Sequence, residues 1–190
     1  MSPGGTSEVQ SERAKKQWEF VEMLKRLETR EDLGALAALR RGLGRAPGEA
    51  SEMYPYVVPY LPPAKHDEDA YFLIAALFAW HRRDWQTSDN ETDRCFGASY
   101  RKLWDETESD STERRFVALL NARSEDLPEH LRHAVGLLKS KEIAINWLEL
   151  LRDVLRWDSE SRIVQRKWAR AFWRGQAVAA AVASTGNEAE

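Results

Sequence analysis

Residues 70–80 of the chain, AYFLIAALFAW, are apolar on almost every side of a helix. A helix without a polar face has to be covered by other elements, so this segment predicts a central core helix that begins at Asp67 or Glu68. Elsewhere, apolar residues recur at helical spacing, and few runs alternate between apolar and polar residues as strands do. The sequence therefore predicts an all-α fold of about eight or nine helices, packed as one compact domain or as two adjoining helical bundles.

Breaks in this pattern divide the chain into consecutive parts. Residues 1–11 are small, polar and glycine-rich, which predicts a disordered N-terminus. Residues 12–83 are expected to form an N-terminal helical subdomain, and residues 84–95, DWQTSDNETDRC, a polar loop or junction. Residues 96–175 are expected to form a C-terminal helical bundle with a basic face, and residues 176–190 a flexible tail.

Capping residues and prolines predict where several helices begin and end. The first helix is expected from about Glu12 to Leu27, and four of its side chains are expected to face inward: Trp18, Phe20, Val21 and Leu24. Thr29 and Asp32 resemble a capping box for the helix that follows. The prolines of MYPYVVPYLPP allow only short helical turns. Further helix starts are expected at Ser111 or Thr112, at Pro128, at Asn146, and at Ser159 or Ser161.

The last predicted helix carries a regular row of arginines. Arg162, Arg166, Arg170 and Arg174 recur every four residues, and each step of four advances about 40° around a helix. They form a slowly winding stripe, with Trp173 among them, whereas the opposite side is apolar: Val164, Trp168, Ala171 and Phe172. A cationic stripe with an aromatic residue can bind a phosphate backbone and stack a base. The alternative is a solvated helix face that binds nothing.

Charge is distributed unevenly along the chain. The net charge is -3, which argues against a general affinity for nucleic acid, but residues 130–175 carry ten Lys/Arg and five acids, a net charge of +5. Residues 51–126 carry nine basic and fifteen acidic residues, a net charge of -6. Such asymmetry between regions matters more for partners than the sum. Three other basic groups are candidates for anion binding, with solvated faces or helix-end contacts as the alternative: Arg40/Arg41/Arg45, Arg101/Lys102 and Arg114/Arg115.

The residue types that carry catalysis or bind metals are sparse. His130 and His133 share a helix face, but nothing nearby in sequence completes a metal site, and the single cysteine, Cys95, has no committed base. No Walker-type loop, GxGxxG, GxSxG or HExxH motif is present. We therefore expect no catalytic residue, no metal and no cofactor. Without a secretory signal or a long apolar segment, the chain is expected to be cytoplasmic and not to contact membrane.

Several segments, taken in order, resemble the CasB family, the small subunit of the type I-E CRISPR surveillance complex called Cascade. The resemblance covers roughly residues 15–174, and no single piece is specific without the others. It rests on LRRGLGR (39–45), YPYVVPYLP (54–62), FLIAALFAWH (72–81), FGASYRKL (96–103), ERRFVALLNARSEDLPEHLRHAVGLL (113–138) and NWLELLRDVLRWDSESRIVQRKWARAFW (146–173).

The resemblance implies a non-catalytic, all-helical subunit in antiviral defence. Its implied partners are the Cascade backbone subunits, the large subunit, a second copy of itself, the guide RNA, and the target and non-target DNA strands. Such a subunit contacts the RNA–DNA duplex and stabilises the displaced non-target strand of the R-loop, where protein contacts to the backbone tip a near-balanced exchange of duplexes.

The resemblance also implies which basic residues bind nucleic acid. Asn121 stands where arginine is expected in relatives, so Arg123 is taken as its substitute. The full set of expected contacts is Arg40, Arg41, Arg114, Arg115, Arg123, Arg132, Arg162 and Arg166. Two other interpretations stay open: a helical scaffold that binds only protein, and, more remotely, a hydrolase or metal enzyme built on His130, His133 or Cys95.

Overall fold

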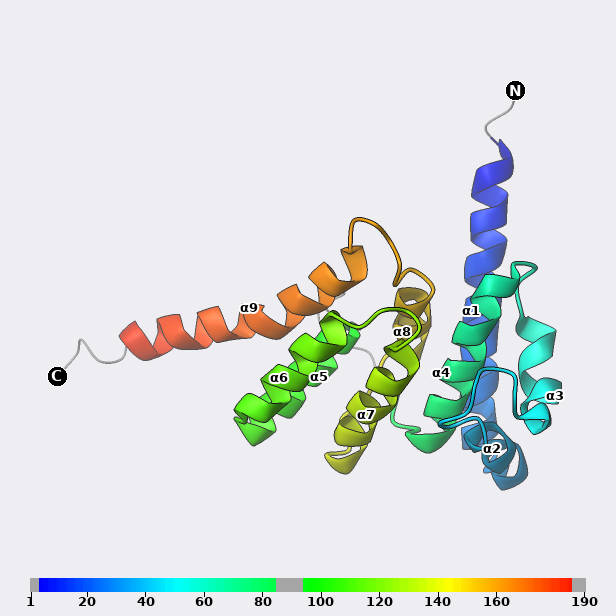
Figure 1. Cartoon of the computed structure of the whole chain (residues 1–190), viewed down its shortest axis with the longest axis horizontal. Coiled ribbons are helices and arrows are strands. Elements are labelled where there is room, and N and C mark those ends of the chain that lie inside the picture. Colours follow the sequence, from blue (N-terminus) through cyan, green and yellow to red (C-terminus); the bar gives the residue numbers. More distant parts are fainter. Residues whose placement is uncertain (1–3, 85–93, 186–190) are drawn as a thin grey trace. The chain divides into compact units, whose positions relative to one another are not determined.

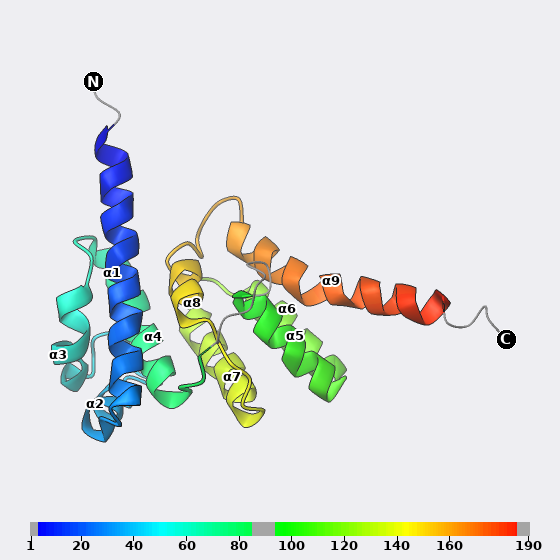
Figure 2. The ribbon, with the colours of Figure 1, turned by 180° about the vertical axis from the view of Figure 1, so that it is seen from behind.

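The structure is a computed structural model that describes the backbone of residues 4–84 and 94–185 (Figures 1 and 2). Within these ranges the chain is helical, and its only strand-like pairing is an isolated bridge between Asp84 and Ile145. The predicted all-α fold is therefore confirmed. In chain order the elements are α1 (Gly4–Thr29), α2 (Leu33–Arg40), η1 (Ser51–Met53), α3 (Tyr54–Val57), η2 (Val58–Tyr60), η3 (Lys65–Asp67), α4 (Glu68–Trp80), α5 (Phe96–Thr107), α6 (Asp110–Leu120), α7 (Leu127–Ser140), α8 (Trp147–Val154) and α9 (Ile163–Thr185), where η marks a 3-10 helix.

The chain forms two compact units. Unit 1 consists of residues 1–82 together with residues 150–155, and unit 2 consists of residues 83–149 together with residues 156–190. The boundary at Arg82 and Arg83 lies beside the predicted polar junction, of which residues 85–93 lie outside the described residues. Helix α8 contributes to both units, because Leu150 begins the short segment that belongs to unit 1.

Unit 1 is built around α4, as the apolar sequence of this helix predicts. Nine residues of α4 are buried, and the helix packs against α1, α2 and α3. Phe20 of α1 lies against Tyr71 of α4, with ring centroids 4.9 Å apart. At one edge of this core, the Arg13 guanidinium donates to the buried carboxylate of Asp67 at 2.6 Å. Covering α4 on several sides removes its apolar surface from water, which is the main source of stability for such a helix.

Unit 2 is held together by a cluster of aromatic side chains between α5, α6 and α9. Phe116 of α6 stacks on Tyr100 of α5 and on Phe172 of α9, with centroids 4.9 and 4.4 Å apart. Trp168 of α9 lies 4.9 Å from Phe96 of α5. Contacts of this kind contribute beyond the area that they bury. The apolar side of the last helix is thus turned inward, as the sequence predicts for Val164, Trp168 and Phe172.

Gly97 of α5 lets α9 approach very closely. A Cβ atom added at Gly97 would overlap the carbonyl oxygen of Trp168 and lie 2.6 Å from its Cα. The atoms in the way are backbone atoms, so no rotation of a side chain can relieve the overlap. The closest approach of the two helices therefore depends on the missing side chain at this position.

Some of the predicted helix ends are confirmed and others are wrong. Asn146 caps α8 by accepting from the Glu149 backbone N–H at 3.0 Å, and Pro128 lies in the first turn of α7. The cap of α2 is Asp32 alone, because its carboxylate accepts from Ala35 while the Thr29 hydroxyl donates back to Lys25 in α1. Ser109, not Ser111 or Thr112, caps α6.

The terminal helices are longer than the sequence analysis predicts. Helix α1 begins at Gly4, inside the segment 1–11 that was expected to be disordered, and ends at Thr29. Helix α9 continues to Thr185, beyond residue 175, where a flexible tail was expected to begin. Adding residues to an existing helix is much easier than starting one, and the alanine-rich run after Gln176 favours it. Residues 1–3 and 186–190 lie outside the described residues.

One predicted core residue of α1 is exposed. Phe20, Val21 and Leu24 are buried as expected, but Trp18 keeps 52% of its surface exposed. Trp18 lies about 200° around the helix from Phe20, so the two cannot share the buried side. The buried position on that turn is taken by Gln17 instead.

Three of the described helices are followed by a glutamate whose backbone conformation usually selects glycine. Glu31, Glu108 and Glu142 have positive φ angles of 52°, 45° and 53° and follow α1, α5 and α7. After α1 and α7, the backbone N–H of the residue that follows the glutamate donates to a carbonyl in the last turn of the helix. In α7 this is the bond from Ile143 to the Leu138 carbonyl at 2.9 Å. Left-handed backbone is strained for a residue with a Cβ, so these three positions store unfavourable conformational energy.

Replacing Gly97 with alanine is expected to destabilise the protein by about 3 kcal/mol, because α5 and α9 must separate to admit the methyl group. The free energy of unfolding in urea measures this effect. Gly34→Ala is the matched control, since an added Cβ at that exposed position of α2 meets only an ordinary contact at 3.6 Å. Equal stability of the two variants would contradict the close approach.

Replacing Glu108 with glycine is expected to stabilise the protein by about 1 kcal/mol, because glycine adopts a positive φ without steric cost. Glu106→Gly, two residues earlier inside α5, is expected to act in the opposite direction by about 0.5–1 kcal/mol. The midpoints of thermal unfolding report the comparison, and a loss of stability in Glu108→Gly would show that the position is not strained.

Candidate nucleic-acid interface

The eight arginines expected to bind nucleic acid are distributed over both units. Arg40 and Arg41 lie in unit 1, at the end of α2. The other six lie in unit 2, on α6, α7 and α9 or in the segments that flank them: Arg114, Arg115, Arg123, Arg132, Arg162 and Arg166. They differ mainly in whether the guanidinium group is already bonded within the chain.

Arg40 and Arg41 make bonds within unit 1. The Arg40 guanidinium donates twice to the Ala79 carbonyl, from Nε at 3.3 Å and from Nη2 at 3.1 Å. Ala79 lies in the last turn of α4, where carbonyls lack partners from the helix itself. Arg41 pairs with Glu52 at 2.6 Å. The pKa of Glu52 lies below its ordinary value, mainly because of a backbone hydrogen bond and secondly because of the hydrogen bond from Arg41. Both arginines are exposed, but each is already bonded to its own unit.

Arg162 is bonded in a similar way in unit 2. Its Nη2 donates to the Leu120 carbonyl at the end of α6, at 2.6 Å. Its φ angle of 50° marks the turn from which α9 starts, and the Arg166 backbone N–H donates to its carbonyl at 3.0 Å. The expected caps Ser159 and Ser161 contact each other through their hydroxyls instead. Arg162 therefore ties the start of α9 to the end of α6.

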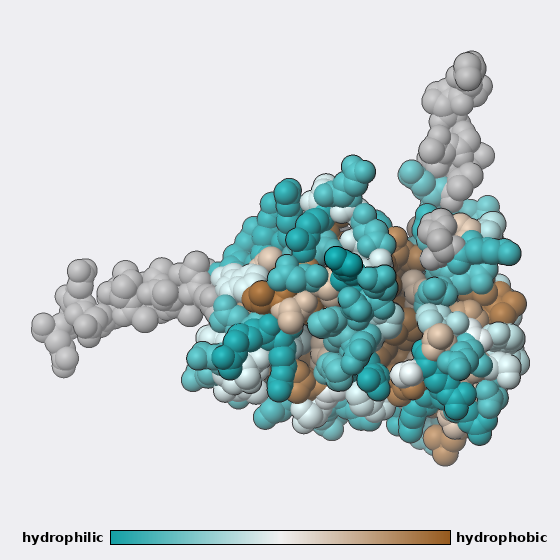
Figure 3. All heavy atoms as spheres, in the orientation of Figure 1, coloured by the Kyte–Doolittle hydropathy of each residue, from teal (hydrophilic) through white to brown (hydrophobic). Residues whose placement is uncertain are grey.

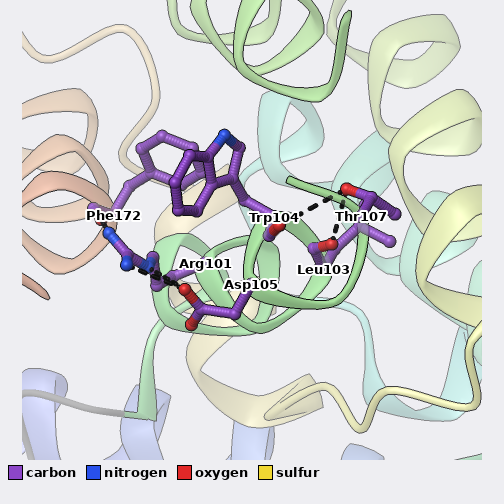
Figure 4. Close-up of polar contacts among 6 residues, drawn as sticks. All are labelled: Arg101, Leu103, Trp104, Asp105, Thr107 and Phe172. Carbon is purple, nitrogen blue, oxygen red and sulfur yellow. Dashed lines mark hydrogen bonds and ion pairs between the residues drawn. The ribbon is translucent and has the colours of Figure 1, made fainter. Parts of the chain in front are cut away.

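Arg101, which the sequence analysis groups with Lys102, is also a bonded residue. Its guanidinium donates to Asp105 of its own helix at 2.7 Å and to the Phe172 carbonyl of α9 at 3.2 Å. Figure 4 shows the group beside the Asp105 carboxylate and near Phe172. The same group lies 4.7 Å from the Trp104 ring centroid, and only 14% of the side chain is exposed. Arg101 joins α5 to α9 and offers little surface to a ligand.

The remaining candidates keep their guanidinium groups available. Arg123 is exposed and only loosely paired with Glu125, at 3.6 Å. Arg114, Arg115 and Arg166 are exposed and Arg132 is half-buried, and none of the four makes a hydrogen bond or an ion pair within the described part of the chain. Arg115 lies close enough to Tyr100 to oppose the burial that raises the pKa of this phenol to about 12. Apart from Arg123, these arginines carry charge that no acid of the described residues neutralises by direct contact.

Arg170 and Arg174 belong with Arg166, although the expected set of contacts omits them. Both are exposed, and neither forms a hydrogen bond or an ion pair among the residues that the structure describes. Arg166, Arg170 and Arg174 follow one another at four-residue spacing on the outer side of α9, and we call them the arginine row. Their four-residue spacing in the sequence already identifies them as neighbours on one side of the helix. On the face seen in Figure 3, hydrophilic residues cover much of both units.

Trp173 is not a free aromatic platform. Its indole N–H donates to Glu113 Oε1 of α6 at 3.0 Å. Its ring lies 5.7 Å from Phe116 and 4.9 Å from Phe172, edge-on to the latter. From the sequence, Trp173 is a candidate for base stacking; in the structure its indole N–H is hydrogen-bonded and the side chain is half-buried.

The residues of the remote enzymatic interpretation belong to two different parts of unit 2. Cys95 is buried at the start of α5, and His130 and His133 lie on α7. Among the described residues, no group of three His, Cys, Asp or Glu side chains is placed to hold a metal ion. None of the helices searched, over the same residues, is long and apolar enough to cross a membrane.

Replacing Arg162 with alanine is expected to lower the free energy of unfolding by about 1 kcal/mol, because its bond to the Leu120 carbonyl is lost. Arg166→Ala, on the outer side of the same helix, is expected to change it by less than about 0.5 kcal/mol. Urea unfolding of both variants tests the division into bonded and available arginines, which an equal loss would contradict.

Comparisons with known proteins identify close relatives. A family model described as CRISPR-associated protein Cse2 matches residues 35–173. A CRISPR-associated protein Cse2 of Thermus thermophilus is 36% identical over 159 residues, which cover 81% of this chain and 88% of that protein. The crystal structure of M. ruber CasB matches with a TM-score of 0.74 and 34% identity, over 88% of this chain and 97% of that chain. A chain of a "CRISPR RNA-guided surveillance complex" matches with a TM-score of 0.75 and 27% identity, over 90% of this chain and 99% of that one.

Proposed function

The chain belongs to the CRISPR-associated Cse2 family, also called CasB, and we propose that it is the non-catalytic small subunit of a type I-E surveillance complex, Cascade. Its partners are then the backbone subunits, the large subunit, a second copy of itself, the guide RNA and the target DNA. The likeness to a chain of a surveillance complex over nearly its whole length supports this assignment.

Within such a complex, we propose that unit 2 contacts nucleic acid through phosphates and helps to hold the displaced non-target strand. The observation that carries this proposal is the set of exposed arginines on α6 and α9 that have no acidic partner in the described residues: Arg114, Arg115, Arg166, Arg170 and Arg174. A guanidinium fork binds two oxygens of one phosphate, whatever the base. A displaced strand of arbitrary sequence needs contacts of this kind.

The bonded arginines are proposed to contribute less. Arg40, Arg41 and Arg162 would have to give up hydrogen bonds within the chain before binding a phosphate. Arg123 and Arg132 are retained as secondary contacts, because one is exposed and loosely paired and the other is half-buried. The main phosphate contacts on α9 are therefore proposed to lie in the middle of the helix and not at its start.

Replacing four available arginines with alanine is expected to weaken binding of the full chain to oligothymidine by at least about tenfold and to reduce the slope of log affinity against log salt by about 3. Fluorescence anisotropy over a salt series measures both quantities. The variant carries R114A, R115A, R166A and R170A.

The control removes the same charge from exposed positions of unit 1: K15A, R26A, R30A and K65A. It is expected to bind almost as the parent does. In the assembled complex, only the first variant should open target DNA poorly. If both variants lost affinity equally, net charge and not this surface would determine binding, and if neither did, the alternative of a scaffold that binds only protein would be favoured.

A further inference from the structure

Glu113 is an acid placed beside the arginine row. It lies in the first turn of α6, and its carboxylate reaches across to α9, where it accepts from Trp173 Nε1 at 3.0 Å. Arg170 stands three residues before Trp173 and Arg166 seven, so all three project from one edge of the helix. Side chains three residues apart on a helix are neighbours, so the carboxylate that touches Trp173 is within reach of a flexible arginine.

The indole N–H holds one oxygen of this carboxylate at α9. Neither Arg166 nor Arg170 contacts Glu113 or any other acid of the described residues. The hydrogen bond to Trp173 is charge-assisted and half-buried, whereas an ion pair with Arg170 would be exposed to water and would immobilise a long side chain. The bond to the indole therefore anchors the carboxylate at Trp173, and in the structure neither arginine forms a direct ion pair with it.

The packing of Trp173 joins the indole to its neighbours in unit 2. Its ring contacts Phe116 and Phe172, and its polar edge is occupied by Glu113. A stacking platform needs a free ring face. Moving the indole to meet a base would break the hydrogen bond and release the carboxylate next to the arginines that hold the strand.

We propose that Trp173 is a positioning residue that binds the Glu113 carboxylate and so keeps the arginine row free for phosphates, and that single strands are held at this surface independently of their bases. This inference rests on the proposed function of unit 2. It adds a role for an acid and an aromatic residue in a surface defined so far by arginines alone.

The test is a double-mutant cycle of the full chain with Trp173→Phe, Glu113→Gln and the double variant. The probes are an oligothymidine of about 15 nucleotides and a strand of abasic sites with the same number of phosphates. Glu113→Gln keeps an acceptor for the indole but removes the charge, so it is expected to bind as the parent does or up to about twofold tighter. Trp18→Phe, at the exposed tryptophan of unit 1, is the aromatic control.

Trp173→Phe is expected to weaken binding of both probes by about threefold, because the released carboxylate pairs with the arginine row. In the Glu113→Gln background the same change is expected to have almost no effect. A loss confined to oligothymidine, or an equal loss in both backgrounds, would show that Trp173 stacks on bases or only supports the fold, and would overturn the proposal. Thermal unfolding of each variant measures stability separately from binding. If the proposal holds, the double variant recovers the affinity that Trp173→Phe loses, whatever its stability.

Failure of this inference can be told apart from failure of the proposed function. If the parent binds both probes with a steep salt dependence but the cycle shows no coupling, only the positioning role of Trp173 is wrong. If the parent binds neither probe at moderate salt, and the complex with R166A, R170A and R174A opens target DNA normally, the phosphate-binding function of unit 2 is wrong as well.

Discussion

The contact between Gly97 and the backbone of Trp168 determines much of the geometry of unit 2. With α9 held this close to α5, the ring of Trp168 reaches that of Phe96, and the ring of Phe172 reaches those of Tyr100 and Phe116. A row of buried side chains on one side of α9 fixes the rotation of that helix, so the same contact directs the arginine row outward. The proposed binding surface and a packing constraint thus arise from opposite sides of one helix.

Much of the fold could be predicted, because it follows from patterns along single helices. The central position of α4 and the inward side of α9 follow from apolar periodicity, and Asn146 and Pro128 act as their residue types predict. The errors occur where two local signals compete. Thr29 and Asp32 both suit a cap, and only the structure shows that Thr29 bonds back into α1. Trp18 is apolar enough for the core but lies on the wrong side of its helix.

The candidate site was predictable only as a set of charges. Spacing identifies arginines on one side of a helix, but it cannot show which of them will meet a carbonyl from a distant segment. Arg40 bonds to Ala79, 39 residues away, and Arg162 bonds to Leu120, 42 residues away. No local sequence pattern predicts contacts over such separations. Glu113 was not among the sequence candidates for the same reason, since its proposed role depends on a tryptophan 60 residues away. Sequence shows which charges exist, and tertiary contacts show which of them are available.

The division of α8 between the units has a consequence for synthesis. Leu150 and Leu151 are fully buried and belong to unit 1, although the rest of that unit ends at Arg82. A nascent chain that has emerged as far as α4 therefore still lacks part of the core of its first unit, and most of the second unit is made before the missing leucines appear. Proteins often fold from the N-terminus as they are translated, but here the core of unit 1 is complete in sequence only once residue 155 has been made. A fragment that stops at residue 82 would for the same reason expose apolar surface and require help to stay soluble.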